Sequence, residues 1–273
     1  MKTRIITGVV AILLFVPICI FSHTIVFPIA MSILSAIGVY EMTKCLNFQK
    51  NYFLTIPMYI LALGLPVFRL ATSKNTSFMA CCMVALFGML IYTLSYVMIK
   101  RLTDRLTDAL TLYAMFVYIV GCFSSIVMIR INENGKFMYL LVFLGAWVCD
   151  TFAYFVGMFF GKHKLIPEIS PKKTIEGSIG GIVFTLIAFV IYGVIVNNAF
   201  SANLSYVHLC VLGIVLPIVS QIGDLVASTV KRAYSIKDYG SLFPGHGGVL
   251  DRFDSVMLVA PTLFITNVIL NLF

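Results

Sequence analysis

Residues 221–255 read QIGDLVASTVKRAYSIKDYGSLFPGHGGVLDRFDS and lie between two long apolar runs. The stretch contains four of the chain's eleven acidic and four of its nineteen basic residues, namely Asp224, Asp238, Asp251, Asp254, Lys231, Arg232, Lys237 and Arg252. Charged side chains beside a bilayer are costly, so their accumulation points to function. The stretch therefore predicts a functional polar segment between membrane-spanning helices.

The apolar runs on either side belong to a chain that is apolar throughout. Of its 273 residues, 60% are hydrophobic and 11% are charged, against roughly 25% charged in soluble domains. Runs of roughly 17 to 25 residues match the bilayer thickness. We expect nine spans, at about 5–22, 25–43, 52–68, 77–99, 109–129, 137–160, 177–197, 204–230 and 252–272. The predicted fold is an all-α polytopic integral membrane protein, divided into N-terminal helices (1–135) and catalytic helices with their loops (136–273).

The basic residues predict the orientation of these spans. With a cytoplasmic N-terminus, the loops outside the cell carry only Arg69, Lys74, Arg130 and Lys136, and the other basic residues face the cytoplasm. The polar loops at 161–176 and 231–251 then also face the cytoplasm, where nucleoside triphosphates are found. The formal net charge of +8 follows from this topology and from attraction to anionic membrane lipids, so it does not require a nucleic-acid partner.

The spacing of polar residues in 221–255 predicts a phosphate site. Asp224, Ser228 and Lys231 recur at helical spacing and share one stripe of a helix. The glycine-rich link 233–248 favours a cradle in which backbone N–H groups approach a ligand. Asp251 and Asp254 are expected in the first turn of the last helix, where carboxylates suit the helix dipole. Three carboxylates from two helix ends can thus converge.

Hard oxygen ligands without paired histidines or cysteines favour Mg²⁺, which leaves positions for water and substrate phosphate. Nearby lysines and arginines would hold further phosphates. The pattern predicts metal-assisted chemistry on a phosphate or pyrophosphate. The alternative is a solvated loop with helix-capping aspartates and topology-determining basic residues.

A second polar stretch, residues 149–181, reads CDTFAYFVGMFFGKHKLIPEISPKKTIEGSIGG. Asp150 lies within an apolar span, and Gly157 and Gly161 continue its face. This pattern favours close helix packing at the glycines, with the carboxylate pointing into a polar interior. Pro171 predicts a turn, and Lys172, Lys173 and Thr174 offer phosphate donors before the next helix. The alternative is again positively charged residues beside a helix cap.

Both stretches resemble the phosphatidate cytidylyltransferase (CDP-diacylglycerol synthase) family. The resemblance rests on the Ser-Pro-Lys-Lys-Thr-x-Glu-Gly run beginning at Ser170 and on Ser228, Lys231, Arg232, Lys237, Asp238, Gly240, Pro244, His246, Gly247, Gly248, Asp251, Arg252 and Asp254. It implies transfer of CMP from CTP to phosphatidic acid with Mg²⁺, and a second cation such as K⁺. It also implies a multi-pass protein of the bacterial inner membrane.

The roles expected of individual residues follow from the spacing and the resemblance together. Metal ligands are Asp224, Asp251 and Asp254; catalytic residues are Asp224, Asp251, Lys231 and Lys237; and substrate-binding residues are Ser170, Lys172, Lys173, Thr174, Ser228, Arg232, His246 and Arg252.

Two other functions remain open at this stage. A secondary transporter would also place Asp150 and Asp224 in the membrane, although no inverted repeat is visible. A lipid kinase using CTP would share a cytoplasmic phosphate site. The sequence leaves a homodimer open as the oligomeric state and identifies no pocket for the nucleobase.

Overall fold

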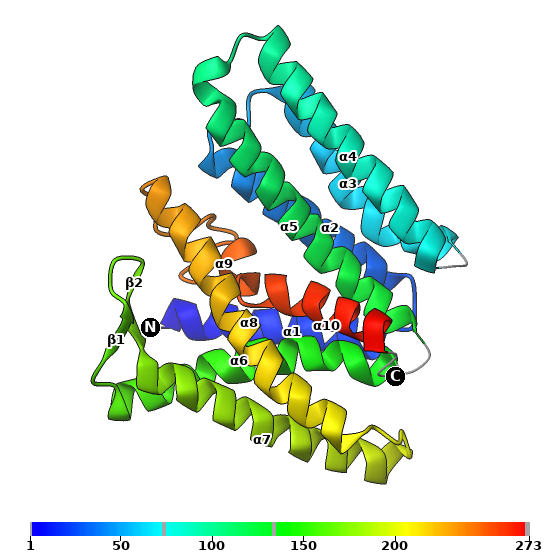
Figure 1. The fold of residues 1–273 in the computed structure, drawn as a ribbon, viewed down its shortest axis with the longest axis vertical. Coiled ribbons are helices and arrows are strands. Elements are labelled where there is room, and N and C mark those ends of the chain that lie inside the picture. Colours follow the sequence, from blue (N-terminus) through cyan, green and yellow to red (C-terminus); the bar gives the residue numbers. More distant parts are fainter. Residues whose placement is uncertain (1, 73–74, 133–134, 271–273) are drawn as a thin grey trace. The chain divides into compact units, whose positions relative to one another are not determined.

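The structure, a computed structural model, describes residues 2–72, 75–132 and 135–270 (Figure 1). Its α-helices are α1 (Lys2–Ile20), α2 (Val26–Cys45), α3 (Tyr52–Phe68), α4 (Asn75–Ile99), α5 (Leu106–Ile131), α6 (Gly135–Phe160), α7 (Ile175–Phe200), α8 (Tyr206–Ala233), α9 (Leu250–Phe253) and α10 (Val256–Leu270). Short 3₁₀ helices occupy Arg69–Ala71 and Thr103–Arg105. The prediction of an all-α fold is confirmed, with the addition of one hairpin of β1 (Lys164–Ile166) and β2 (Ser170–Thr174) in the described ranges.

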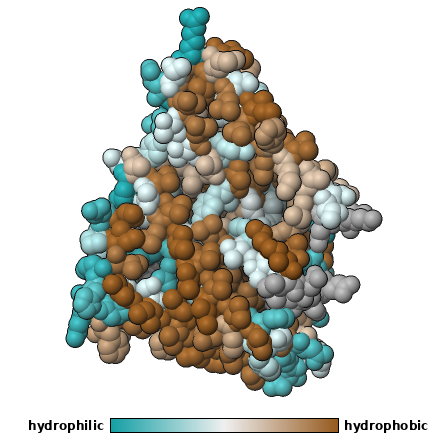
Figure 2. All heavy atoms as spheres, in the orientation of Figure 1, coloured by the Kyte–Doolittle hydropathy of each residue, from teal (hydrophilic) through white to brown (hydrophobic). Residues whose placement is uncertain are grey.

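Helices coincide with all nine predicted spans. Within the described part of the chain, seven are long and apolar enough to cross a membrane, and shorter apolar stretches at 7–20 and 256–269 belong to α1 and α10. Large apolar side chains such as Val84 (73% exposed) and Phe159 (70% exposed) lie on the surface. Figure 2 shows this apolar character over most of the visible face. Such a surface suits lipid rather than water. The number of spans and their orientation stay predictions.

Two compact units, each discontinuous in sequence, make up the chain. The first unit comprises Met1–Met128 and Ile236–Arg252, and the second comprises Ile129–Ser235 and Phe253–Phe273. The polar link 236–252 is therefore part of the unit formed by the N-terminal helices. The predicted division at residue 135, which is a division by function, stays a prediction.

In the first unit, α2 packs against α3, and α3 packs against α4. Phe27, Met31 and Met42 on α2 are fully buried. Arg105 closes the C-terminal end of α2, since its guanidinium donates to the carbonyl oxygen of Leu46 at 2.5 Å and lies 4.0 Å from the centre of the Phe48 ring. The C-terminal end of α2 and the start of α5 therefore lie at the same end of this unit, as the predicted topology requires.

In the second unit, α6, α7, α8 and α10 pack together, and glycines set the distance between α6 and α7. A Cβ atom on Gly177 would lie 2.5 Å from the Ala153 carbonyl oxygen, and one on Gly181 would lie 2.9 Å from the Cys149 carbonyl oxygen. On α6, a Cβ on Gly157 would meet the Cα of Gly177 at 3.6 Å. The expected close helix packing at Gly157 is confirmed, because Gly177 lies opposite it on α7 and a larger residue at Gly177 would push the two backbones apart.

The hairpin joins α6 to α7 and differs from the predicted local structure. Its strands pair antiparallel, with Lys164 opposite Thr174 and Ile166 opposite Ser170. Pro171 lies within β2, so the turn predicted there is wrong; the chain turns at residues 167–169 instead. A two-stranded ribbon tolerates proline because an edge strand has backbone N–H groups without a ladder partner. The hairpin thus carries the Lys172–Lys173 pair as a strand.

Candidate active site

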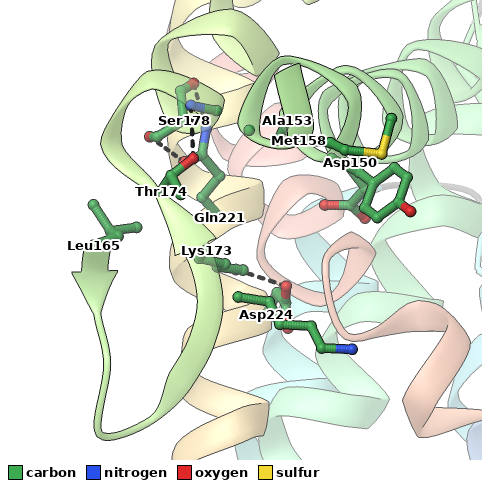
Figure 3. Close-up of a pocket in the computed structure, with 13 residues that line it drawn as sticks. Asp150, Ala153, Met158, Leu165, Lys173, Thr174, Ser178, Gln221 and Asp224 are labelled. Carbon is green, nitrogen blue, oxygen red and sulfur yellow. Dashed lines mark hydrogen bonds and ion pairs between the residues drawn. The ribbon is translucent and has the colours of Figure 1, made fainter. Parts of the chain in front are cut away.

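The second unit contains a cavity of about 250 Å³ where the hairpin meets α6, α7 and α8 (Figure 3). It is lined by Asp150, Ala153, Tyr154, Gly157, Met158, Leu165, Lys172, Lys173, Thr174, Gly177, Ser178, Gln221 and Asp224. Carboxylates from α6 and α8 and lysines from β2 therefore share one pocket. The two polar stretches recognised in the sequence contribute to it together.

An ion pair crosses this pocket. The Lys173 Nζ lies 2.6 Å from Asp224 Oδ2, and both side chains are about a quarter exposed, at 24% and 23% (Figure 3). On α8 the Ser228 hydroxyl donates to Asp224 Oδ1 at 3.3 Å, which confirms that these two residues share a stripe. Asp224 therefore carries an ammonium and a hydroxyl partner, and substrate or metal would compete with the ammonium.

Asp254 forms the second carboxylate position of this unit. It lies in the turn between α9 and α10 rather than in the first turn of the last helix, so that part of the prediction is wrong. Lys231 Nζ lies 3.9 Å from Asp254 Oδ2, and Lys231 is only 9% exposed. Asp254 and Asp224 are thus two carboxylates of this unit that each have a lysine as counter-ion.

The donor set is suited to a hard cation. Asp224 and Asp254 offer carboxylate oxygens, and Asp150 lines the same pocket as Asp224. Across residues 2–72, 75–132 and 135–270, no group of three or more histidine, cysteine, aspartate or glutamate side chains is arranged to hold a metal ion. Lysines serve as the counter-ions of Asp224 and Asp254 in this arrangement. The metal assignment therefore stays a prediction that the donor chemistry fits.

The other predicted residues of the hairpin region occupy different environments. Lys172 is exposed and lines the pocket, and Ser170 is partly buried at the start of β2. The Thr174 hydroxyl accepts from the Gly177 N–H at 3.1 Å and caps α7. Arg232 Nε donates to the Ile169 carbonyl oxygen at 3.4 Å, which ties α8 to the hairpin turn. Thr174 and Arg232 thus shape the pocket in addition to any contact with substrate.

Sequence reasoning missed a set of hydrogen-bonded side chains near the ion pair, formed by Ser178, Gln221 and Cys149. The Ser178 hydroxyl donates to the Gln221 side-chain oxygen, and Gln221 Nε2 donates to the Ser178 carbonyl oxygen at 3.2 Å (Figure 3). Gln221 Nε2 also lies 3.4 Å from Cys149 Sγ. These contacts connect α6, α7 and α8 one turn from Asp224. The sequence did offer one signal for these contacts, since Gln221 places a polar side-chain amide within an apolar run.

The remaining predicted residues, Lys237, His246, Asp251 and Arg252, belong to the first unit. Lys237 and Arg252 are exposed, and His246 is partly buried. Asp251 is 8% exposed, and its Oδ2 accepts from the N–H groups of Tyr239 (2.8 Å) and Gly248 (3.0 Å). Asp251 therefore orders the glycine-rich link in which His246 lies.

Six backbone amides of this link donate within the protein. Tyr239 and Gly248 donate to Asp251, Val249 and Leu250 donate to Glu41, Phe243 donates to Gly247, and His246 donates back to Phe243. Four of these amides, those of Tyr239, Phe243, His246 and Gly248, fall within the predicted cradle at 233–248, and for these four the predicted approach to a ligand is wrong. Sequence reasoning also missed Glu41, although an acid inside the apolar run 25–43 was a usable signal.

Comparison with known proteins adds a separate observation. Residues 2–270 match the cytidylyltransferase family. A Staphylococcus saprophyticus protein named phosphatidate cytidylyltransferase is 34% identical over 263 residues, covering 96% of this chain and 97% of its own. A Bacillus subtilis protein of the same name is 35% identical over 269 residues, covering 97% and 96%. The similarity therefore extends through both units, including the hairpin and the glycine-rich link.

Proposed function

The chain belongs to the cytidylyltransferase family, and from that membership we propose that it transfers CMP from CTP to phosphatidic acid, giving CDP-diacylglycerol and pyrophosphate. The observation that carries the proposal is similarity along the whole chain to proteins named phosphatidate cytidylyltransferase. The pocket supports it, because lysines and carboxylates meet there between helices suited to lipid.

The proposed chemistry needs positioning and charge neutralisation more than it needs a base. An oxygen of the phosphatidate, already an anion, forms a bond to the α-phosphorus of CTP while the bond from that phosphorus to the bridging oxygen breaks and pyrophosphate leaves. Negative charge accumulates around the α-phosphorus and the leaving group. Lys172 and Lys173 line the pocket, and we propose that they hold the phosphate groups.

We also propose that Asp224 and Asp254 bind Mg²⁺. Asp150 is a further carboxylate in the lining of the same pocket as Asp224. When bound, the ion would supply neutralisation of phosphate charge. Lys173 and Lys231 lie beside these carboxylates as their counter-ions. Asp251 as a further ligand, and a second cation such as K⁺, remain expectations from the sequence and the family.

We propose that the remaining predicted groups contact phosphates or lipid headgroups. Arg232 and Ser228 belong to the same helix as Asp224, and Lys237, His246 and Arg252 belong to the polar link 236–252. The proposed location is the cell membrane of a bacterium, with the hairpin facing the cytoplasm, where CTP is available. The bacterial sources of the relatives support this location.

The experiment that tests the function uses CTP labelled at either end of its triphosphate. Purified protein in detergent with phosphatidic acid and Mg²⁺ should transfer the α-label to lipid and release the γ-label as pyrophosphate. Transfer of the γ-label to lipid would identify a kinase instead. Transfer of neither label by folded protein would leave a transporter as the better interpretation and overturn the proposal.

A further inference from the structure

Glu41 is an acidic residue near the C-terminal end of α2, and it is 4% exposed. Its carboxylate accepts two hydrogen bonds from the glycine-rich link, with Oε1 accepting from the Val249 N–H and Oε2 from the Leu250 N–H, each at 2.9 Å. Both groups belong to the first unit. One side chain therefore caps the start of α9 from a helix more than two hundred residues away in sequence.

Two glycines of the link leave room for this carboxylate. A Cβ atom on Gly248 would collide with the Glu41 Oε1, Cδ and Oε2 atoms, and one on Gly240 would collide with Oε1 and Cδ. The left-handed φ angles between Tyr239 and Leu250 belong instead to Gly245 (77°) and Gly247 (83°). Gly240 and Gly248 are therefore small because Glu41 fills the space beside them, whereas Gly245 and Gly247 meet a backbone requirement.

Glu41 and Asp251 both accept hydrogen bonds from backbone N–H groups of the link. Asp251 Oδ2 accepts from Tyr239 and Gly248, so the two carboxylates together hold four backbone amides of the link. Hydrogen bonds to a charged acceptor are stronger than those between neutral groups, and a buried carboxylate without such donors would be costly. The pair therefore keeps the backbone on both sides of His246 in one conformation.

We propose that Glu41 is a positioning residue for the CMP transfer assigned above, and the inference rests on that assignment. By holding residues 239–250 in one conformation, it places His246 within this segment, and Lys237 and Arg252 just beyond its two ends, before the phosphate-bearing substrate arrives. In this role Glu41 acts through the link and is not itself a contact of the substrate or the reacting atoms. Its effect is preorganisation, which reduces the ordering that binding must otherwise accomplish.

This role predicts a specific kinetic change. If Glu41→Ala leaves the link ordered in only a fraction of molecules, the apparent KM for CTP rises by the inverse of that fraction, about tenfold, while kcat at saturation stays near the wild-type value. A loss of folded enzyme would instead lower the maximal rate per milligram of protein and leave the KM unchanged. Glu41→Gln, which keeps the shape and one acceptor oxygen, should give an intermediate KM.

The glycines provide a matched test. Gly248→Ala should raise the KM in the wild-type background and add little in the Glu41→Ala background, where its Cβ no longer meets the carboxylate. Gly247→Ala is the control, because its φ of +83° and its approach to Asp251 make its cost independent of Glu41. Its effect should therefore be additive with that of Glu41→Ala.

Hydrogen exchange separates this proposal from the assigned reaction. Amide exchange at Val249 and Leu250 should accelerate in Glu41→Ala, whatever reaction the enzyme catalyses. Absence of CMP transfer by the wild-type protein would refute the reaction while leaving this exchange result to be measured. Unchanged KM in Glu41→Gln, or equal effects of Gly248→Ala in both backgrounds, would overturn the positioning role. If Glu41→Ala does not fold, Glu41→Gln with Gly248→Ala decides the question.

Discussion

Lys173 on strand β2 and Asp224 on helix α8 form an ion pair of 2.6 Å inside the pocket of the second unit. Each partner is a group that the proposed reaction requires, the ammonium for phosphate and the carboxylate for Mg²⁺. The pair orients both side chains before substrate binds. Binding of a metal and a phosphate would then exchange one ion pair for two favourable contacts.

Removing the charge of Asp224 should abolish most of the activity. Asp224→Asn preserves the shape but loses a charged ligand, so turnover should fall on the order of a hundredfold or more. Steady-state CMP transfer at saturating Mg²⁺ measures this change. Asp104→Asn, at an exposed position in a 3₁₀ helix of the first unit, is the control. A folded Asp224→Asn protein with turnover near that of the wild type would rule out the metal assignment.

The two adjacent lysines of β2 should differ in their kinetic effect. Lys172→Ala removes an exposed pocket contact and should mainly raise the KM for a phosphate-bearing substrate. Lys173→Ala also leaves Asp224 without its ammonium partner and should lower kcat as well. Lys164→Ala, on the neighbouring strand and outside the pocket lining, should leave both parameters near wild type. Indistinguishable profiles for Lys172→Ala and Lys173→Ala would argue against this division.

Because α6 and α7 pack closely, replacing Gly181 by alanine should destabilise the protein far more than replacing Gly121 by alanine. A Cβ on Gly181 would lie 2.9 Å from both the carbonyl oxygen and the sulfur of Cys149, so Gly181→Ala should destabilise by about 1–3 kcal/mol. Gly121→Ala on α5, where a Cβ meets nothing within 4 Å, should be neutral or stabilising. Thermal unfolding in detergent would compare the two. Equal losses at both sites would contradict the packing explanation.

The predicted orientation can be tested by labelling single cysteines in a background without native thiols. Leu242→Cys and Glu168→Cys, both at exposed positions, should react with an impermeant reagent only in inverted vesicles. A cysteine at Gly240 would be a poor reporter, because its Cβ would collide with Glu41. Labelling of either site in intact cells would contradict a cytoplasmic active site. It would also remove the proposed access to CTP.

Much of the helical architecture was accessible from the sequence, because each span is determined by local apolar content matched to membrane thickness. The stripe of Asp224 and Ser228 was equally accessible, since helical spacing alone places them together. The hairpin at 164–174 was not predicted, because two short strands at a helix junction have no periodic signal of their own. The break between α9 and α10 was also missed, because a two-residue turn has no periodic signal either.

The sequence alone determined the membrane class, the family resemblance and the identity of the charged residues, since these depend on composition and local spacing. Partnerships between distant residues came only from the tertiary structure. Lys173 pairs with Asp224, Lys231 with Asp254, and Glu41 with the amides of Val249 and Leu250. Such contacts depend on which helix faces meet and how closely, and that outcome is decided by packing of the whole unit rather than by any single stretch of chain.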